Sequence, residues 1–148
     1  MYEQALDEVG EAFNEHLSGN RSALVCVVST QDLADPAQSA LKSAAEALGY
    51  GPKPCVFVTI QKTDEKLDAQ ALFLLIEGLD PRCIIAADEH AARTLAGAYR
   101  CKVPLQAPSR ALGRTVVAFS SFSAMLSDER EKQKAWQLLK KLPKFGKR

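Results

Sequence analysis

Residues 67–99 constrain the fold of this chain more than any other stretch, because they read in turn as helix, buried strand and helix. Leucine and isoleucine recur at helical spacing in the first part. Asp80-Pro81 ends that helix, because the residue before a proline is disfavoured in helical geometry. Cys83–Ala87 is an unbroken apolar run, typical of a parallel strand covered on both faces. Asp88 then stands at the N-cap position of a second helical pattern. The succession predicts a layered α/β fold.

Four short apolar runs are separated by helical patterns along the chain. These predicted strands are Ala23–Val28, Cys55–Ile60, Arg82–Ala87 and Thr115–Phe119. Parallel strands need long crossover connections, for which helices are the usual solution. The pattern therefore predicts a three-layer α/β/α sandwich with a four-stranded, mainly parallel sheet. A length of 148 residues fits a single domain spanning residues 1–148.

The same periodicity predicts the elements that flank the strands. Tyr2–Leu17 forms the first predicted helix. The last helix begins near Asp128, with a glutamate three residues later as in a capping box, and it buries Trp136 in the core. Two stretches lack a periodic pattern. Residues 61–66 are predicted to be a charged loop, and residues 100–114 an irregular, exposed crossing.

Charge and cysteine content bear on the class of function. The net charge is +1, so the field of the whole molecule favours no polyanionic partner. The four cysteines stand alone in sequence, without a C-x-x-C pair, so we expect mostly buried thiols and neither a metal nor another cofactor. They are Cys26, Cys55, Cys83 and Cys101. No apolar run approaches the ~20 residues of a membrane span, and the charged start is unlike a signal peptide, so we expect a cytoplasmic protein.

Ligands of open parallel sheets bind beyond the carboxyl ends of the strands, which limits the search for a site to four short segments. These segments are Ser29–Asp32, Ile60–Thr63, Ala87–Asp88 and Ser120–Ser123. They contain no histidine and no glycine-rich phosphate loop. We interpret the two histidines of the chain, His16 and His90, as exposed surface side chains.

Few groups at these strand ends suit catalysis. Asp88 is explained by helix capping, whereas Asp32 is the better carboxylate candidate. No general base lies near Ser121 in sequence, so the activation that a nucleophilic hydroxyl needs is not indicated. The candidate catalytic residues are Thr30, Gln31, Asp32 and Ser121.

Most of the chain resembles a uracil-DNA glycosylase of the iron–sulfur bacterial type. Residues 75–87 and 91–95 are similar to that family's helix, its R-P-x-V-I-V-A-L-G strand and its A-A-R-x-L helix. Residues 113–117, followed by Lys132 and Trp136, resemble its closing strand and last helix. The resemblance implies a glycosylase-like sheet with strand order 2-1-3-4.

The same resemblance implies that the catalytic parts are missing. Where the family has Gly-Glu-x-Pro-Gly to place the hydrolytic water, this chain has Ser29–Leu33, with Thr30 in the water-placing segment. Ile60 stands in place of the asparagine that reads the uracil edge, and Ser121 in place of the histidine that stabilises departing uracil. Losing one such stabilising donor typically costs ~10²–10³ in rate. The cluster cysteines have no counterparts, and the segment carrying the aromatic floor is deleted between Asp32 and Pro36.

Shorter blocks resemble the psi subunit of the bacterial DNA polymerase III clamp loader. They are Leu24–Val28, Asp35-Pro36 and the helix of Trp136. That protein has a glycosylase-like fold without glycosylase chemistry, and its function is carried by contacts with partners. The similarity favours a binding role.

Three functional hypotheses follow, with a protein or DNA as the expected partner. The first is a non-catalytic interaction module on a degenerate uracil-DNA glycosylase-like fold, associated with DNA repair or replication. The second is a nucleic-acid-binding protein with a reduced groove and a basic C-terminal tail. Its predicted contacts are Arg93, Arg100, Lys102, Arg110, Arg114, Ser120 and Ser121. The third is a hydrolase or DNA glycosylase with a site rebuilt around Gln31, Asp32 and Ser121.

Overall fold

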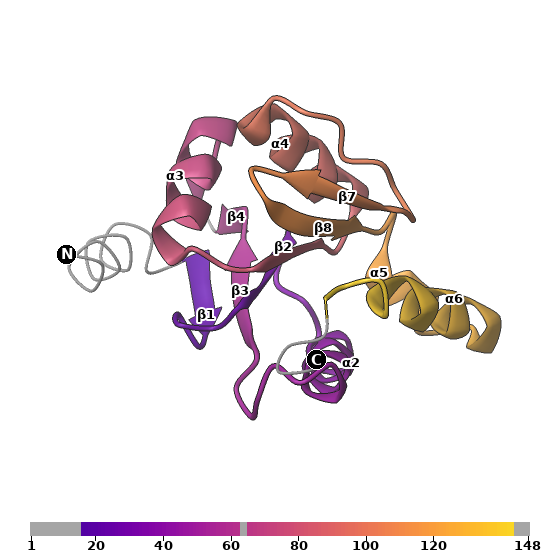
Figure 1. Ribbon diagram of the computed structural model, residues 1–148. Coiled ribbons are helices and arrows are strands. Elements are labelled where there is room, and N and C mark those ends of the chain that lie inside the picture. Colours follow the sequence, from indigo (N-terminus) through magenta and orange to yellow (C-terminus); the bar gives the residue numbers. More distant parts are fainter. Residues whose placement is uncertain (1–15, 63–64, 144–148) are drawn as a thin grey trace.

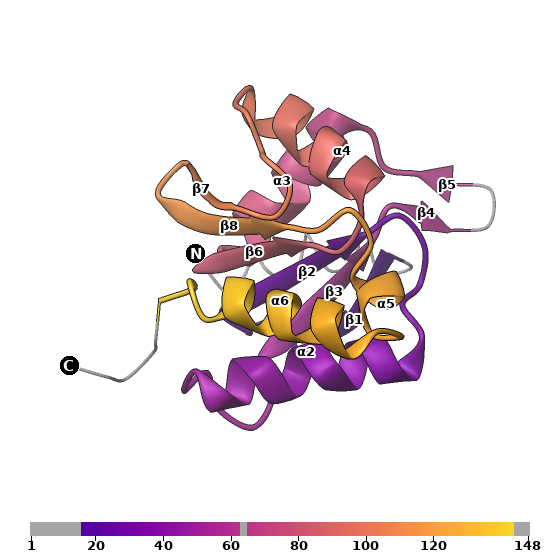
Figure 2. The same cartoon turned by 90° about the vertical axis from the view of Figure 1, so that its right-hand side faces the viewer.

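The computed structural model describes residues 16–62 and 65–143. One six-stranded sheet lies between two helical layers (Figures 1 and 2). Its strands are β1 (Leu17–Gly19), β2 (Val25–Ser29), β3 (Cys55–Thr59), β6 (Cys83–Ala86), β7 (Pro108–Ala111) and β8 (Arg114–Ala118). The helices are α2 (Asp35–Ala47), α3 (Ala69–Leu79), α4 (Glu89–Tyr99), α5 (Phe122–Met125) and α6 (Glu129–Leu139). The expected α/β class is confirmed.

The centre of the sheet is parallel. Strands β3, β2, β6 and β8 are neighbours in that order, and each adjoining pair runs in the same direction. Every residue of these four strands is buried, because helices cover both faces. The four predicted strands are therefore present, each within one or two residues of its expected bounds.

The prediction of a four-stranded sheet is wrong at both edges. At one edge β1 pairs antiparallel with β3, and at the other β7 pairs antiparallel with β8. Leu17 was expected to end a helix, and instead it begins β1; the rest of that predicted helix lies outside the described residues. The crossing expected to be irregular contains β7.

The hairpin of β7 and β8 turns at Leu112-Gly113. Both residues have positive φ, 46° at Leu112 and 83° at Gly113. A two-residue hairpin turn with both central φ values positive matches the twist of the flanking strands. Leucine seldom occupies the first of these positions, so the turn could not be recognised from its residues. A second small hairpin, β4 (Gln61–Lys62) and β5 (Glu65–Lys66), replaces the charged loop expected at residues 61–66.

Two apolar cores lie on the two faces of the sheet. Helices α2, α5 and α6 cover one face, and α3 and α4 cover the other (Figure 2). The prediction that Trp136 lies in the core is only partly right. Its ring is half-buried against the first core, with Lys140 Nζ 5.7 Å from the ring centroid, while Leu138 and Leu139 are buried.

Gly19 allows the edge strand β1 to lie against β3. Its φ is 90°, and a Cβ added there would meet the carbonyl oxygen of Cys55 at 2.8 Å. We expect Gly19→Ala to lower the free energy of unfolding by about 2–3 kcal/mol, measured by urea denaturation. Gly51→Ala is the matched control, since its φ is 91° but nothing lies within 4 Å of the added Cβ, so it should cost only about 1 kcal/mol. Equal losses in the two variants would contradict the close approach.

Candidate functional site

The carboxyl ends of the parallel strands are joined by backbone hydrogen bonds that continue past the strands themselves. Ile60 N donates to Ser29 O at 2.8 Å, and Ala87 N donates to Val28 O at 2.8 Å. Phe119 N donates to Ala86 O at 2.9 Å on the next strand along. The edge at which a ligand was expected is thus held together for at least one residue beyond each strand.

Asp88 connects the ends of two strands and also caps a helix. Its Oδ1 accepts a hydrogen bond from Ala91 N at 2.8 Å, which confirms the predicted N-cap of α4. The same carboxylate accepts two bonds from Thr30, from Oγ1 at 2.6 Å and from the backbone N at 2.8 Å. Thr30, at the place where the glycosylase resemblance puts the water-placing segment, therefore has both donors directed at Asp88.

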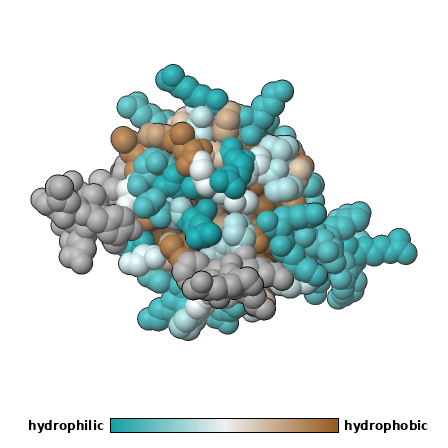
Figure 3. Space-filling view, in the orientation of Figure 1, coloured by the Kyte–Doolittle hydropathy of each residue, from teal (hydrophilic) through white to brown (hydrophobic). Residues whose placement is uncertain are grey.

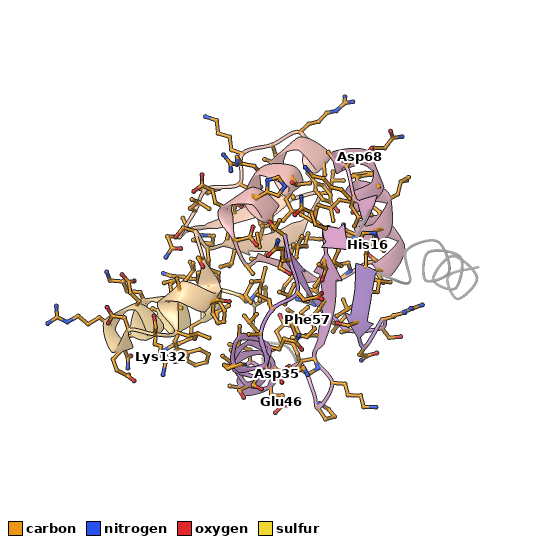
Figure 4. All side chains as sticks on the ribbon, turned by 180° about the vertical axis from the view of Figure 1, so that it is seen from behind. His16, Asp35, Glu46, Phe57, Asp68 and Lys132 are labelled. Atoms are coloured by element: carbon orange, nitrogen blue, oxygen red, sulfur yellow. The ribbon has the colours of Figure 1, made fainter. Side chains whose placement is uncertain are left out.

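Asp32 and His16 are both hydrogen-bonded to Thr59, the last residue of β3. Thr59 Oγ1 donates to Asp32 Oδ1 at 2.9 Å, and His16 Nδ1 donates to Thr59 O at 2.7 Å. The prediction that His16 is exposed is wrong, since only 4% of the residue is accessible. Its position follows from β1, which begins at Leu17 and places the preceding ring over the end of β3 (Figure 4). Gln31, the other candidate of this segment, is exposed.

Ser121 caps the short helix α5. Its Oγ accepts a hydrogen bond from Ala124 N at 3.2 Å, and its backbone forms an isolated antiparallel bridge with Asp88. Ser120 is exposed, and its N donates to Gln106 Oε1 at 3.3 Å.

An open pocket of about 560 Å³ lies beside Ser121. Gln106 and two charged residues of α6, Glu131 and Lys134, also line it. These last two form an ion pair of 3.7 Å with each other. Sequence reasoning missed all three residues; the only signal for Gln106 was its place between two prolines of the crossing.

The predicted basic contacts do not form one cluster. Arg100, Lys102 and Arg110 are exposed, and Arg110 Nη2 donates to Gly113 O at 3.0 Å within the β7–β8 hairpin. Ser120 and Ser121 lie on the separate pocket beside α6.

Arg114 is buried, contrary to its expected place among exposed nucleic-acid contacts. Its Nη1 lies 2.9 Å from Glu77 Oε2, and its Nη2 lies 2.6 Å from Asp80 Oδ1. The hydroxyl of Tyr99 donates to the same Glu77 oxygen at 2.6 Å. Burial and this bond to a carboxylate raise the pKa of Tyr99 above its usual value. Arg114 therefore ties β8 to α3.

Three of the cysteines are buried, as predicted, and Cys101 is half-buried. Burial raises the pKa of Cys26 to about 12, with a smaller contribution from Cys55. Burial likewise raises the pKa of Cys55 to about 12. Such thiols are poor nucleophiles and metal ligands at neutral pH. Within residues 16–62 and 65–143, no three His, Cys, Asp or Glu side chains gather in a group that could hold a metal ion.

No protein-family model matches the sequence, and no curated protein matches it either. Among the helices of the described part, none combines the length and apolar character needed to cross a membrane.

The polar side chains at the strand ends form hydrogen bonds with other groups of the fold. The carboxylates of Asp88 and Asp32 accept hydrogen bonds from hydroxyls of neighbouring strands, and the hydroxyl of Ser121 accepts one from a helix N-terminus. Groups held in this way stabilise the edge of the sheet, and a catalytic role would need them to turn toward a substrate.

Proposed function

We propose that this chain is a non-catalytic interaction module on a degenerate uracil-DNA glycosylase-like scaffold, with a place in DNA repair or replication. One observation carries the proposal. The polar groups at the carboxyl edge of the sheet, above all Thr30 and Asp88, are bonded to one another across strands. A glycosylase needs such groups directed at a water molecule and at the base.

The surroundings of the three positions that the resemblance singles out support this proposal. Thr30 directs both of its donors to Asp88, and Ile60 is fully buried. Ser121 caps α5 through its hydroxyl. At each position the side chain present contributes to packing or to hydrogen bonding within the fold. The scaffold is then free to serve through its outer surfaces, as in the psi subunit that the sequence resembles.

The pocket beside Ser121 supports a second candidate, a hydrolase with a rebuilt site. Glu131 lines this pocket and is the carboxylate that sequence reasoning did not find near Ser121. Its Oε1 is paired with Lys134 at 3.7 Å, and the hydrogen bond recorded for the Ser121 hydroxyl is the one that it accepts from Ala124 N, so neither contact directs Glu131 at Ser121 as a base. The interaction module is therefore the better supported function.

The test of the proposal is a single-turnover assay with the full-length protein in excess over a single-stranded, uracil-containing oligonucleotide. We expect no release of uracil above the protein-free background, because two losses of ~10² or more leave little rate even if they combine imperfectly. An active uracil-DNA glycosylase serves as the positive control.

Variants distinguish uracil released by a contaminating enzyme from uracil released by a rebuilt site in this chain. Release of uracil that disappears in Asp32→Asn or Ser121→Ala, and persists in the exposed control Asp35→Asn, would overturn the proposal. Release that no variant alters points to a contaminating enzyme, which a repeat purification of the Ser121→Ala protein removes, and the proposal then stands.

A further inference from the structure

A groove lies between α3 and α4. The two helices are in contact at Ala69 and Gly97, where a Cβ added to Gly97 would lie 3.6 Å from the Ala69 Cβ. Two adjoining hollows, of about 590 and 520 Å³, share these two small residues. We call the whole the α3–α4 groove. Phe73, Tyr99 and Arg100 line one end, and Lys66, His90 and Arg93 line the other.

The groove has an apolar side. The rings of Phe73 and Tyr99 lie 5.1 Å apart, and both residues are half-buried. Leu74, the next residue of α3, lines neither hollow but is 54% exposed, and it is one of two large exposed hydrophobic side chains among the described residues. Figure 3 shows hydrophobic surface over α3. Apolar groups gathered beside a groove are typical of a docking surface.

The charge of the groove is mainly positive. Three exposed cations line it: Lys66 lies in β5, Arg93 lies in α4, and Arg100 is the C-cap of α4. Two nearby carboxylates offset part of this charge. Asp68 accepts from Ala71 N at 2.8 Å as the N-cap of α3, and Glu89 lies 3.7 Å from Arg93. A partner with carboxylates on the flanks of an apolar stripe would complement this surface.

We propose that the α3–α4 groove docks an acidic amphipathic helix of a partner protein. Apolar side chains at i, i+3/i+4 and i+7 of that helix would lie against Phe73 and Leu74, and its flanking carboxylates would meet Arg93 and Arg100. The lining residues of α4 run from His90 to Tyr99, almost the whole of that helix, so about three helical turns of a partner fit along it. This inference rests on the proposed interaction function and names the kind of partner.

A protein helix fits the groove better than a nucleic-acid strand does. The rings of Phe73 and Tyr99 are tilted by 58° to each other, and the Tyr99 hydroxyl is held by Glu77, so the pair offers no flat platform for successive bases. The small residues Ala69 and Gly97 lie where the two hollows meet and leave room there for aliphatic side chains.

The test measures binding of labelled probe peptides to the full-length protein by fluorescence anisotropy. The probe is a designed 18-residue helix with a leucine stripe and glutamates on its flanks, and the control peptide carries lysine at every glutamate. We expect the glutamate peptide to bind at least tenfold more tightly than the lysine peptide. Arg93→Glu with Arg100→Glu should weaken its binding at least tenfold, and Leu74→Ser at least threefold.

Arg130→Glu is the matched control variant, because Arg130 is an exposed cation on the distant helix α6, and it should change the affinity less than twofold. Circular dichroism melting checks that each variant is folded, and the single variant Arg93→Glu is used if the double variant is not. Equal binding of both peptides, or binding unaffected by the groove variants, would overturn the inference.

Two further measurements identify a wrong occupant. Binding of a single-stranded oligothymidine that is lost in the groove variants, without binding of the glutamate peptide, would assign the groove to nucleic acid. Sedimentation showing a dimer that these variants dissociate would assign it to a second copy of the chain. Either result overturns the inference. The uracil-release assay tests the groups at the strand ends and not the α3–α4 groove. A failure of the proposed function is therefore distinguishable from a failure of this inference.

Discussion

Replacing Arg114 with alanine is expected to lower the free energy of unfolding by about 3 kcal/mol, one of the two largest effects that we predict. Its side chain is only 10% exposed and lies against two carboxylates, so the variant would leave Glu77 and Asp80 without their common cation. Removing one partner of a buried ion pair typically costs about 3–5 kcal/mol. The lower end applies because Asp80 is 62% exposed and can be solvated again.

Urea denaturation measures this loss as a lower midpoint with an unchanged slope. Arg110→Ala is the control, since Arg110 is an exposed arginine of the same hairpin whose guanidinium donates to a carbonyl, that of Gly113. It should change stability by less than about 0.5 kcal/mol. A loss below about 1 kcal/mol in Arg114→Ala would show that the ion-pair network adds little to the attachment of β8 to α3.

Asp88→Ala is the second substitution with a large expected effect, a loss of about 3 kcal/mol. The loss of the N-cap of α4 accounts for about 1 kcal/mol. The two hydrogen bonds from Thr30 end on a charged acceptor, and such bonds contribute about 1.5–3 kcal/mol each, with incomplete additivity between neighbours. The variant also leaves the N–H and hydroxyl of Thr30 without an acceptor at a half-buried position.

Asp68→Ala is the matched control for this substitution. Asp68 caps α3 through the same kind of bond, 2.8 Å to Ala71 N, and it is exposed. It should therefore cost only about 1 kcal/mol. Thermal and urea unfolding of the two variants compare the cap alone with the cap plus the cross-strand link. Equal losses would mean that the link to Thr30 is energetically neutral, and the main support for the proposed function would weaken.

The elements predicted well from sequence are those encoded locally. Each of the four central strands is a run of consecutive apolar residues, and the N-caps at Asp88 and Asp128 are defined by residues within one turn. The two edge strands lack such a signal. Strand β1 has only three residues, and β7 begins with a proline, so neither shows apolar alternation that would mark a strand.

The contacts of the site could not be predicted, because they join distant parts of the chain. Thr30 and Asp88 are 58 residues apart, and Arg114 and Asp80 are 34 apart. Local patterns assigned Asp88 its cap but gave no indication of its second partner. For the same reason, local sequence predicts Arg114 to be a surface cation. Its burial follows from the β7–β8 hairpin, which places it beside α3.

The two antiparallel edges affect how the protein behaves at high concentration. A parallel sheet that ended at β3 and β8 would expose the unpaired N–H and C=O groups of two fully buried, valine-containing strands, which is a template for joining another chain. Strand β1 covers one of these edges with only three residues, and β7 covers the other with four, the first of which is a proline that has no N–H to donate. The short length of both edge strands, together with the missing N–H donor in β7, therefore opposes strand-to-strand polymerisation.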